Sequence, residues 1–355
     1  MKVKLNGDEA LIEVEETSER EGKPEVVVIT GASAGLGRAI GRRFAQDGAH
    51  IGLVARGRDG LEGAKADVEK LGGKAIIIQG DVADPETTER AAAETEKAFG
   101  EIDIWINDAM VSVFSPVKEM KPEEYKRVTE VTYLGFVYGT LAALKRMLPR
   151  DRGVIVQVGS ALAYRGIPLQ SAYCASKHAI QGFMDSLRTE LIHDKSNVRA
   201  SMVQMPAMNT PQFSWVKSLL PNKPQPVPPI YQPEVGAEAI YFVAHNDRRE
   251  MYVGYPTVEA IVGNKIAPSL GDWYLAKGGY KSQQTDESVA PDRKNNLYEP
   301  VPGDHGAHGS FDAKSKDFSP QVWADVNRGK VALAGLGIAA GAALLWNKFR
   351  SRQDS

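Results

Sequence analysis

The chain has 355 residues, of which 43% are hydrophobic and 25% charged, and this composition is typical of a globular protein with a large core. Its 43 basic and 45 acidic residues give a net charge of −2, which lacks the basic excess of nucleic-acid-binding proteins, so no nucleic-acid partner is expected. The single cysteine, Cys174, excludes an intrachain disulfide, and the charged N-terminal residues 1–24 lack the apolar core of a secretory signal.

The first buried strand is predicted at the β-branched run of residues 26–29, after an N-terminal extension of residues 1–24. Thr30-Gly31-Ala32-Ser33-Ala34-Gly35-Leu36-Gly37 follows, and then the helical pattern of residues 38–46. Glycines between a strand and a helix let the backbone approach a phosphate, and the helix N-terminus offers it free N–H groups. The segment predicts a dinucleotide-binding loop, and a glycine-rich turn without a ligand is the alternative.

The second strand is predicted at residues 51–55 and ends at Arg56, with Arg58 close behind it. In dinucleotide-binding folds an acidic residue near this strand end holds the ribose 2′-hydroxyl of NAD, whereas a basic residue accommodates the 2′-phosphate of NADP. Because no acid stands at the strand end, the sequence favours NADP(H) as cofactor and leaves NAD(H) as the alternative. The alternative is that Arg56 is only a solvated loop charge, in which case the sequence gives no preference for NADP(H) over NAD(H).

Strands and helices alternate along the rest of the chain up to residue 205, with strands predicted at 75–79, 102–106, 154–158 and 198–205 and helices at 59–71, 85–99, 122–147 and 171–193. This alternation indicates βαβ units, so the predicted fold class is α/β, a Rossmann-like doubly wound parallel sheet. Ligands of such sheets bind at the carboxyl ends of the strands. The residues predicted at these ends are Gly31, Arg56, Asp81, Asn107, Ser160 and Pro206.

Tyr173 and Lys177 are four residues apart on a predicted helix and therefore lie on one face of it. A neighbouring ammonium favours the phenolate, so we expect Lys177 to lower the pKa of Tyr173 from its usual ~10. A tyrosine tuned in this way can give or take a proton near neutral pH, as carbonyl reduction requires. An ordinary exposed helix face is the alternative for this pair taken alone.

Together these segments resemble the short-chain dehydrogenase/reductase family over residues 25–260. Residues 30–37 match its TGxxxGxG loop, Asp81-Val82 the pair that contacts adenine, Ser160 its catalytic serine, Tyr173 and Lys177 its YxxxK motif, and residues 206–210 the loop after strand six, whose threonine contacts the nicotinamide amide. The resemblance implies that Tyr173 is the general acid/base, that Lys177 holds the nicotinamide ribose, and that Ser160 hydrogen-bonds the substrate oxygen. It implies a homo-oligomer and a cofactor site made of Gly31, Ser33, Ala34, Gly35, Leu36, Gly37, Arg56, Asp81, Val82, Asn107, Tyr173, Lys177, Pro206 and Thr210.

The sequence departs from the family pattern at three places near the expected site, one of which is Ala207, where the family usually has a glycine after the strand-six proline. The family's NNAG motif appears as Asn107-Asp108-Ala109-Met110, so that a methionine replaces a glycine beside the cofactor. The family's catalytic asparagine aligns with Thr132, whose hydroxyl can donate and accept, so a proton relay either persists with a different geometry or is impaired. The predicted function is an NADP(H)-dependent oxidoreductase, and the alternative is a catalytically weak or inactive NADP(H)-binding scaffold or sensor.

The chain after Pro206 is rich in proline and aromatic residues up to Pro233, and in the resembled family this region forms the substrate lid. Apolar residues are predicted near it at the strand ends, namely Val111, Phe114, Leu162, Tyr164, Met205 and Met208. They predict an apolar pocket for a bulky lipophilic carbonyl or alcohol, and the alternative is that they pack the lid on the body. No metal site is predicted, because His305 and His308 have no further ligand nearby in the sequence.

The C-terminal extension follows a catalytic domain predicted at residues 25–280. Residues 281–328 are rich in Asp, Ser, Gly, Pro and Asn and predict a mobile polar linker. Within the final segment, 329–355, residues 331–346 carry no charge, and as a helix they cover about 24 Å of a ~30 Å hydrocarbon core. They predict a membrane anchor for a cytoplasmic catalytic domain, with an interfacial helix or a helix docked on a partner protomer as alternatives.

Overall fold

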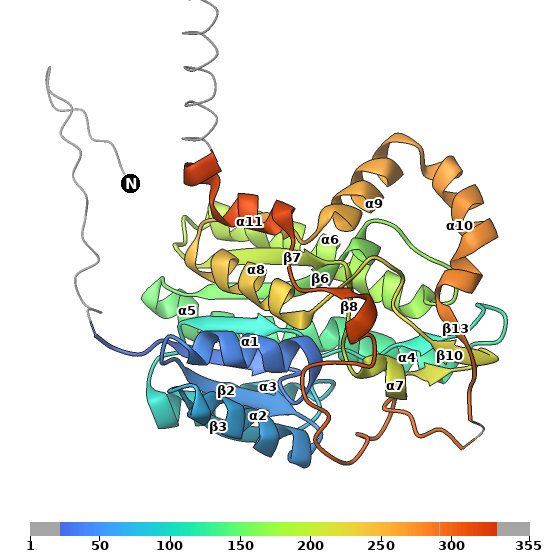
Figure 1. The fold of residues 1–355 in the computed structure, drawn as a ribbon. Coiled ribbons are helices and arrows are strands. Elements are labelled where there is room, and N and C mark those ends of the chain that lie inside the picture. Colours follow the sequence, from blue (N-terminus) through green and yellow to red (C-terminus); the bar gives the residue numbers. More distant parts are fainter. Residues whose placement is uncertain (1–21, 291, 332–355) are drawn as a thin grey trace, which may run out of the picture.

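The computed structural model describes residues 22–290 and 292–331, and at its centre is a seven-stranded parallel sheet (Figure 1). The strand order is β12-β7-β6-β4-β1-β2-β3. From β1 the chain adds β2 and β3 on one side and then crosses over to add β4, β6, β7 and β12 on the other side. Its strands are β1 (Val26–Thr30), β2 (His50–Ala55), β3 (Lys74–Gln79), β4 (Ile104–Asn107), β6 (Val154–Ser160), β7 (Arg199–Met205) and β12 (Glu250–Tyr252). The predicted α/β fold class is confirmed, and a cofactor crevice is expected where the strand order reverses.

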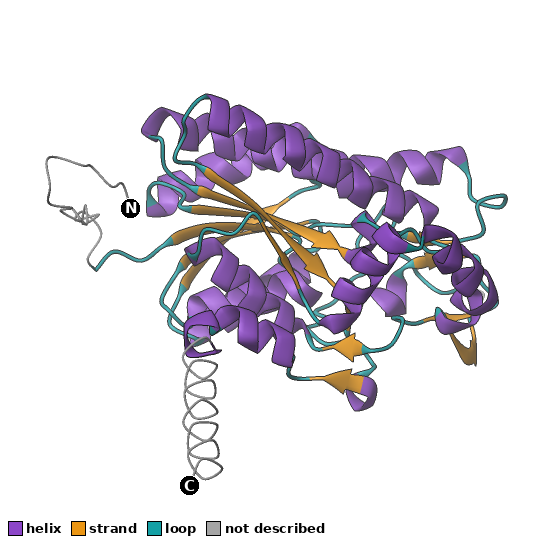
Figure 2. Cartoon of the chain, turned by 90° about the horizontal axis from the view of Figure 1, so that it is seen from above, coloured by secondary structure: helices purple, strands orange, loops and turns teal. Residues whose placement is uncertain are grey.

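Helices cover both faces of this sheet (Figure 2). On one face lie α1 (Gly35–Ala45), α2 (Arg58–Lys70) and α8 (Pro233–His245), and on the other α3 (Pro85–Phe99), α4 (Pro122–Thr129), α5 (Gly135–Met147) and α6 (Ser171–His193). Strand β1 explains why both faces must be covered. Val27 and Ile29 pack into the apolar cluster under α1, α2 and α8, and Val26 and Val28 pack into the cluster under α3 to α6. All four side chains are therefore buried.

The helix predicted at residues 122–147 is interrupted by a π-helical turn, Glu130–Leu134, between α4 and α5. The turn places the Thr132 hydroxyl against the chain that follows β4, where it bonds both backbone groups of Val111. Such π-helical turns are rare and often mark functional sites. In contrast, α6 begins and ends where the sequence predicts, at residues 171 and 193.

Two helices that the sequence analysis did not assign follow the last sheet strand, α9 (Tyr255–Ile266) and α10 (Pro268–Ser282). They project from the body as a hairpin (Figure 1). The remaining short elements are β5 (Val113–Phe114), β8 (Ala207–Met208), α7 (Gln212–Trp215), β9 (Lys217–Ser218), β10 (Asn222–Pro224), β11 (Ile230–Tyr231), β13 (Gln284–Ser288), β14 (Ser315–Lys316), α11 (Pro320–Val326) and the 3₁₀ turns Leu148–Arg150, Ala161–Ala163 and Asp312–Lys314. No helix within residues 22–290 and 292–331 is long and apolar enough to cross a membrane.

The segment predicted as a mobile linker, residues 281–328, differs from that expectation. Strand β13 pairs with β10, β14 pairs with β11, and α11 packs on α8. The composition of this stretch is polar, but it contains buried Leu297, Ala307 and Val322 and charged groups whose partners lie on the body. Average composition cannot reveal such isolated anchors. The predicted anchor at residues 331–346 lies, apart from Val331, outside the described residues.

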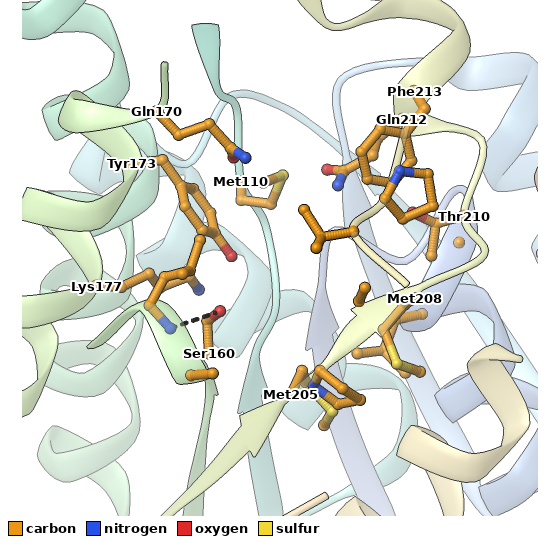
Figure 3. Close-up of a pocket in the computed structure, with 18 of the residues that line it drawn as sticks. Met110, Ser160, Gln170, Tyr173, Lys177, Met205, Met208, Thr210, Gln212 and Phe213 are labelled. Carbon is orange, nitrogen blue, oxygen red and sulfur yellow. Dashed lines mark hydrogen bonds between the residues drawn. The ribbon is translucent and has the colours of Figure 1, made fainter. Parts of the chain in front are cut away.

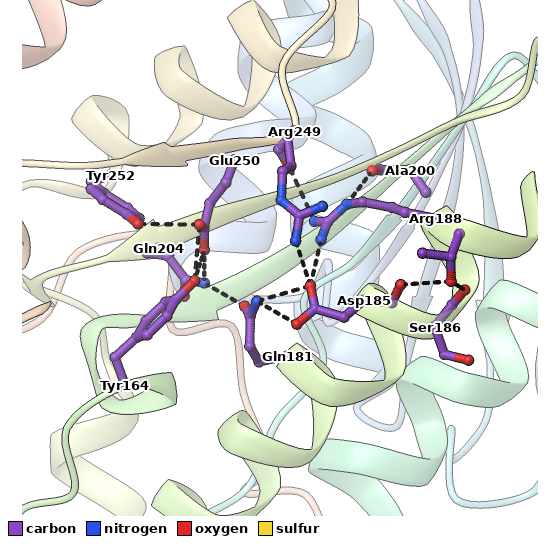
Figure 4. A network of polar contacts seen from close by, with 11 residues as sticks. Tyr164, Gln181, Asp185, Ser186, Arg188, Ala200, Gln204, Arg249, Glu250 and Tyr252 are labelled. Atoms are coloured by element: carbon purple, nitrogen blue, oxygen red, sulfur yellow. Dashed lines mark hydrogen bonds and ion pairs between the residues drawn. The ribbon is translucent and has the colours of Figure 1, made fainter. Parts of the chain in front are cut away.

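A polar network fastens the last sheet strand to α6 and to the chain after β6 (Figure 4). The Glu250 carboxylate accepts hydrogen bonds from the Tyr164 hydroxyl at 2.8 Å and from the Gln204 amide at 2.6 Å. Asp185 of α6 accepts from Arg249 at 2.6 Å, next to Glu250. The network therefore fixes the segment that carries Ser160 relative to the helix that carries the predicted catalytic pair.

Candidate active site

A cavity of about 910 Å³ opens at the carboxyl ends of β1, β4, β6 and β7, under the chain that follows β7. Ser160, Tyr173 and Lys177 lie on one side of it, and Met208, Thr210 and Phe213 lie opposite (Figure 3). Most of the predicted site residues line this cavity: Gly31, Ser33, Ala34, Gly35, Leu36, Arg56, Asp81, Val82, Ser160, Tyr173, Lys177, Pro206 and Thr210. The fold thus brings together residues spread over most of the predicted catalytic domain.

The glycine loop is packed too tightly for side chains at two positions. A Cβ on Gly31, whose φ is +77°, would lie 2.8 Å from the backbone of Ala109, and one on Gly37 would lie 2.4 Å from the Gly31 carbonyl oxygen. Helix α1 begins after Ala34, whose side chain caps none of the N–H groups of the first turn, and Gly35 and Leu36 of that turn line the cavity. This backbone is suited to a phosphate group, as the sequence predicts.

Ser160, Tyr173 and Lys177 converge from β6 and α6. Ser160 is the last residue of β6, and its hydroxyl is hydrogen-bonded to Tyr173. Lys177 is one helical turn beyond Tyr173, with its Nζ 5.5 Å from the centre of the Tyr173 ring, and it donates a 2.6 Å hydrogen bond to the Val158 carbonyl oxygen. A carbonyl oxygen of a substrate placed between Ser160 and Tyr173 would therefore meet two hydroxyl groups.

The pKa of Tyr173 does not follow the sequence expectation. Burial raises it above its ordinary value, the hydrogen bond with Ser160 lowers it, and the charge of Asp108 raises it further. The predicted net lowering of the Tyr173 pKa is wrong, because burial is the largest influence on it. Burial also lowers the Lys177 pKa to about 8, so Lys177 still carries its charge near neutral pH. Tyr173 is therefore a protonated phenol at neutral pH, which suits it to donate a proton to a carbonyl oxygen.

Asp108 is a charged residue of the site that the sequence analysis did not single out, although its motif signals it, since Asp stands where the family has Asn. Its side chain is half-buried and lines the cavity, and its carboxylate accepts the Gly37 backbone N–H. Burial raises the Asp108 pKa to about 7, and the charge of Lys177 opposes this rise. Asp108 in turn raises the Lys177 pKa, so the two groups hold each other in the charged form.

Three predicted site residues do not line the cavity, namely Gly37, which packs against Gly31 inside the glycine loop, Thr132 and Asn107. The Thr132 hydroxyl donates to the Val111 carbonyl oxygen at 2.8 Å and accepts from the Val111 N–H at 3.1 Å. Asn107 is fully buried and hydrogen-bonds Thr140 and Gln157 inside the core. Their contacts are structural, because they fix the chain that leads from β4 into the cavity.

Arg56 and Asp81 mark the end of the cavity expected to hold adenosine, and the C-terminal segment reaches them there. Arg56 donates hydrogen bonds to carbonyl oxygens of Asn296 and Tyr298 at 2.6 and 2.9 Å. Asp81 is paired with Arg127. The solvated loop charge considered for Arg56 is therefore wrong, and burial lowers the pKa of its guanidinium.

The other half of the cavity is apolar, as the sequence predicts. Of the apolar residues expected near the lid, Val111, Leu162, Met205 and Met208 line it together with Met110. Phe114 instead packs with lid residues in a small separate apolar cluster, and Tyr164 bonds Glu250. Helix α10, which the sequence analysis did not assign, adds Leu270, Trp273 and Tyr274 to the lining.

Residues 25–218 match the family model of the short chain dehydrogenases. The chain belongs to the short-chain dehydrogenase family. It is 33% identical over 285 residues to an uncharacterized oxidoreductase, YxnA, of Bacillus subtilis, with 80% of each chain covered. It is 28% identical over 290 residues to a fatty acyl-CoA reductase of Acinetobacter baylyi, covering 80% of this chain and 95% of that protein.

An alcohol dehydrogenase of the archaeon Thermococcus sibiricus, solved with 5-hydroxy-NADP, has a similar structure. The TM-score is 0.56 at 28% sequence identity, over 65% of this chain and 95% of that one. As a short-chain dehydrogenase, this chain is an oxidoreductase that acts on CH–OH or C=O groups with a nicotinamide cofactor. The tight glycine loop and the buried Lys177 beside Tyr173 fit such a cofactor.

Proposed function

We propose that this short-chain dehydrogenase transfers hydride between NADP(H) and a hydrophobic carbonyl or alcohol, with Tyr173 as the acid/base. The observation that carries the proposal is the single cavity that joins the glycine loop, the Ser160–Tyr173–Lys177 group and an apolar lining. A bound nicotinamide cofactor would supply the hydride. The steps below concern what the residues of this chain contribute.

Substrate polarisation and proton transfer are assigned to the two hydroxyl groups. Ser160 hydrogen-bonds the substrate oxygen, and Tyr173 donates its proton to that oxygen as negative charge develops on it. Lys177 lies one helical turn from Tyr173, and its positive charge stabilises the phenolate that remains. In the direction of alcohol oxidation the phenol must first be deprotonated, so its raised pKa predicts that oxidation speeds up at alkaline pH.

The hydrophobic substrate class is supported by the cavity and its mouth. Leu270 and Trp273 line the cavity while remaining 65% and 57% exposed, so the α9–α10 hairpin offers an apolar entrance. An extended lipophilic chain would bury these side chains, which contributes roughly 25 cal/mol per Å² of apolar surface. The similarity to a fatty acyl-CoA reductase agrees with a long aliphatic substrate.

The test is NADPH consumption by the full-length protein in mild detergent with a panel of lipophilic aldehydes and ketones. Tyr173→Phe removes only the hydroxyl, and we expect it to lower kcat about 10²–10⁴-fold while NADPH still binds. Tyr280→Phe is the matched control, because Tyr280 is 48% exposed and does not line the cavity. Equal turnover by Tyr173→Phe and the native protein would refute Tyr173 as the acid, and absent turnover with every compound would favour a scaffold or sensor.

The preference for NADP(H) rests on Arg56 at the end of β2. The phosphate of NADP gains from a cation that is weakly hydrated and partly buried, as Arg56 is. We expect Arg56→Asp to reverse the ratio of NADPH to NADH affinity, and Arg58→Asp, whose side chain is exposed and pairs with Glu62, to change it little. An unchanged ratio in Arg56→Asp would contradict the assignment.

We also propose that the apolar stretch of residues 331–346 tethers a cytoplasmic catalytic domain to a membrane. The proposal rests on the sequence, in which basic residues flank a charge-free segment that ends at Trp346. Ultracentrifugation of lysed cells should bring the full-length protein down with membranes, and replacing Leu344 and Leu345 by Asp should release it. Recovery of the native protein in the supernatant would remove this proposal.

A further inference from the structure

The part of the C-terminal segment that crosses the cavity, residues 295–309, is here called the strap. Its residues Asn296, Pro300, Val301, Gly303 and His305 line the same cavity as the glycine loop. At one end the Asn296 N–H donates to the Trp215 carbonyl oxygen, and at the other the Gly309 N–H donates to that of Asn209. The strap is thus fastened at both ends to the chain that follows β7.

The strap engages the cation that is proposed to bind the 2′-phosphate of the cofactor. Both terminal nitrogens of Arg56 donate to it: Nη2 to the Asn296 carbonyl oxygen at 2.6 Å, and Nη1 to that of Tyr298 at 2.9 Å. The same Nη1 is 3.4 Å from the Leu297 carbonyl oxygen. The strap therefore engages both terminal nitrogens of Arg56, and these are the nitrogens that a phosphate bound in the bidentate, fork-like arrangement would use.

The strap also lies next to Asp81 and Val82, the pair expected at the adenine ring. Leu297 is fully buried and belongs to the same apolar cluster as Val82 and Val131. Arg127, which pairs with Asp81, donates to the Leu297 carbonyl oxygen at 2.9 Å. A buried apolar side chain flanked by hydrogen bonds therefore anchors the strap beside the pair expected to meet the adenine ring.

A third contact lies at the N-terminus of α1. The Gly35 N–H, in the first turn of the helix, donates to the Gly306 carbonyl oxygen at 3.0 Å. The Gly306 carbonyl oxygen carries a partial negative charge, and it lies where the pyrophosphate of the cofactor is expected to meet the N-terminus of α1. Next to it Asp304 is paired with Arg38 of the same helix, whose guanidinium is buried.

We propose that the strap competes with the cofactor for its adenosine half, so that NADP(H) binds only after the strap has left Arg56, the Asp81–Val82 pair and Gly35. This inference rests on the proposed cofactor site. Three separate groups of that site are engaged by one continuous segment, with a carbonyl group at each end and an apolar side chain between them. Cofactor affinity therefore depends on how readily residues 295–309 detach.

The experiment measures NADPH binding by the full-length protein, through nicotinamide fluorescence at equilibrium and in stopped flow. Leu297→Ser removes the buried apolar contact, and Asp304→Ala removes the exposed partner of Arg38 without touching the core. We expect each change to lower the Kd for NADPH at least tenfold and to speed binding. Phe318→Ser is the matched control, because Phe318 is 57% exposed, belongs to the same C-terminal segment and lies outside the strap.

Hydrogen exchange gives a second readout that does not depend on the variants folding normally. Addition of NADPH to the native protein should speed amide exchange within residues 295–309, because the strap leaves as the cofactor enters. Slower exchange there, together with weaker NADPH binding by Asp304→Ala, would overturn the competition and make the strap a clasp over bound cofactor. If neither the native protein nor either variant bound NADPH or NADH, the proposed function itself would fall, and the inference with it.

Discussion

The Thr132 hydroxyl donates to the Val111 carbonyl oxygen and accepts from the Val111 N–H, so one side chain satisfies both backbone groups of a single residue. Both residues are buried, and no water can replace these bonds without opening the core. The threonine that replaces the family's asparagine therefore joins the π-helical turn to the chain after β4. Its hydroxyl hydrogen is committed to Val111, which leaves none to donate to a proton relay.

Replacing this threonine by valine should be costly to stability. Thr132→Val keeps the shape but leaves the Val111 N–H and carbonyl oxygen unsatisfied, which costs about 1–3 kcal/mol of the free energy of unfolding. Thr129→Val is the control, since Thr129 is exposed and bonds only the Tyr125 carbonyl oxygen of its own helix. Denaturant unfolding measures both, and equal midpoints for the two variants would contradict the account.

The charge of Asp108 should set the alkaline limit of carbonyl reduction. Burial lowers the Lys177 pKa to about 8, and the negative charge of Asp108 opposes this lowering. Asp108→Asn removes that charge, so Lys177 loses its proton at a lower pH and ceases to stabilise the Tyr173 phenolate. The alkaline limb of the pH–kcat profile should therefore shift to lower pH. If kcat fell equally at every pH and the alkaline limb did not move, the charge of Asp108 would not set the pKa of Lys177, and the role of Asp108 would be structural.

The glycine loop should not tolerate a methyl group at Gly37. A Cβ there would lie 2.4 Å from the Gly31 carbonyl oxygen, and backbone cannot move aside as a flexible side chain can. We expect Gly37→Ala to abolish NADPH binding and to lower Tm. On the same helix, Gly41→Ala would meet its nearest neighbour, a Val68 methyl, at 3.7 Å, an ordinary contact. It should bind NADPH normally and gain up to about 1 kcal/mol from helix propensity. Equal behaviour of the two variants would argue against a tight phosphate loop.

The α9–α10 hairpin should determine the preference for chain length. Trp273 lines the cavity mouth, with the Lys277 ammonium 3.8 Å from its ring centre, which keeps the ring in place. Trp273→Ala should raise KM for long-chain aldehydes several-fold and leave kcat for short ones unchanged. Ile192→Ala, at a site 75% exposed on α6, is the control. The same KM for all chain lengths in both variants would place the substrate elsewhere.

The sequence by itself determined the sheet and the core of the site, because both depend on local patterns. Apolar runs such as Val26–Ile29 require burial on both faces, and glycines between a strand and a helix allow only a few backbone geometries. A spacing of four places Tyr173 and Lys177 on one helix face whatever surrounds them. For the same reason the cavity residues on the strand ends were predictable as a group.

Only the tertiary structure decided the electrostatics of the site and the place of the C-terminal segment. The direction of the Tyr173 pKa depends on burial and on Asp108, neither of which follows from the YxxxK spacing. The strap meets Arg56 about 240 residues away in the chain through backbone carbonyl groups, which every residue possesses and no composition reveals. Likewise, α9 and α10 lack a continuous apolar face, because part of their apolar surface lines a cavity instead of a core. Long-range contacts of this kind arise when the whole chain folds, and local sequence patterns therefore cannot specify them.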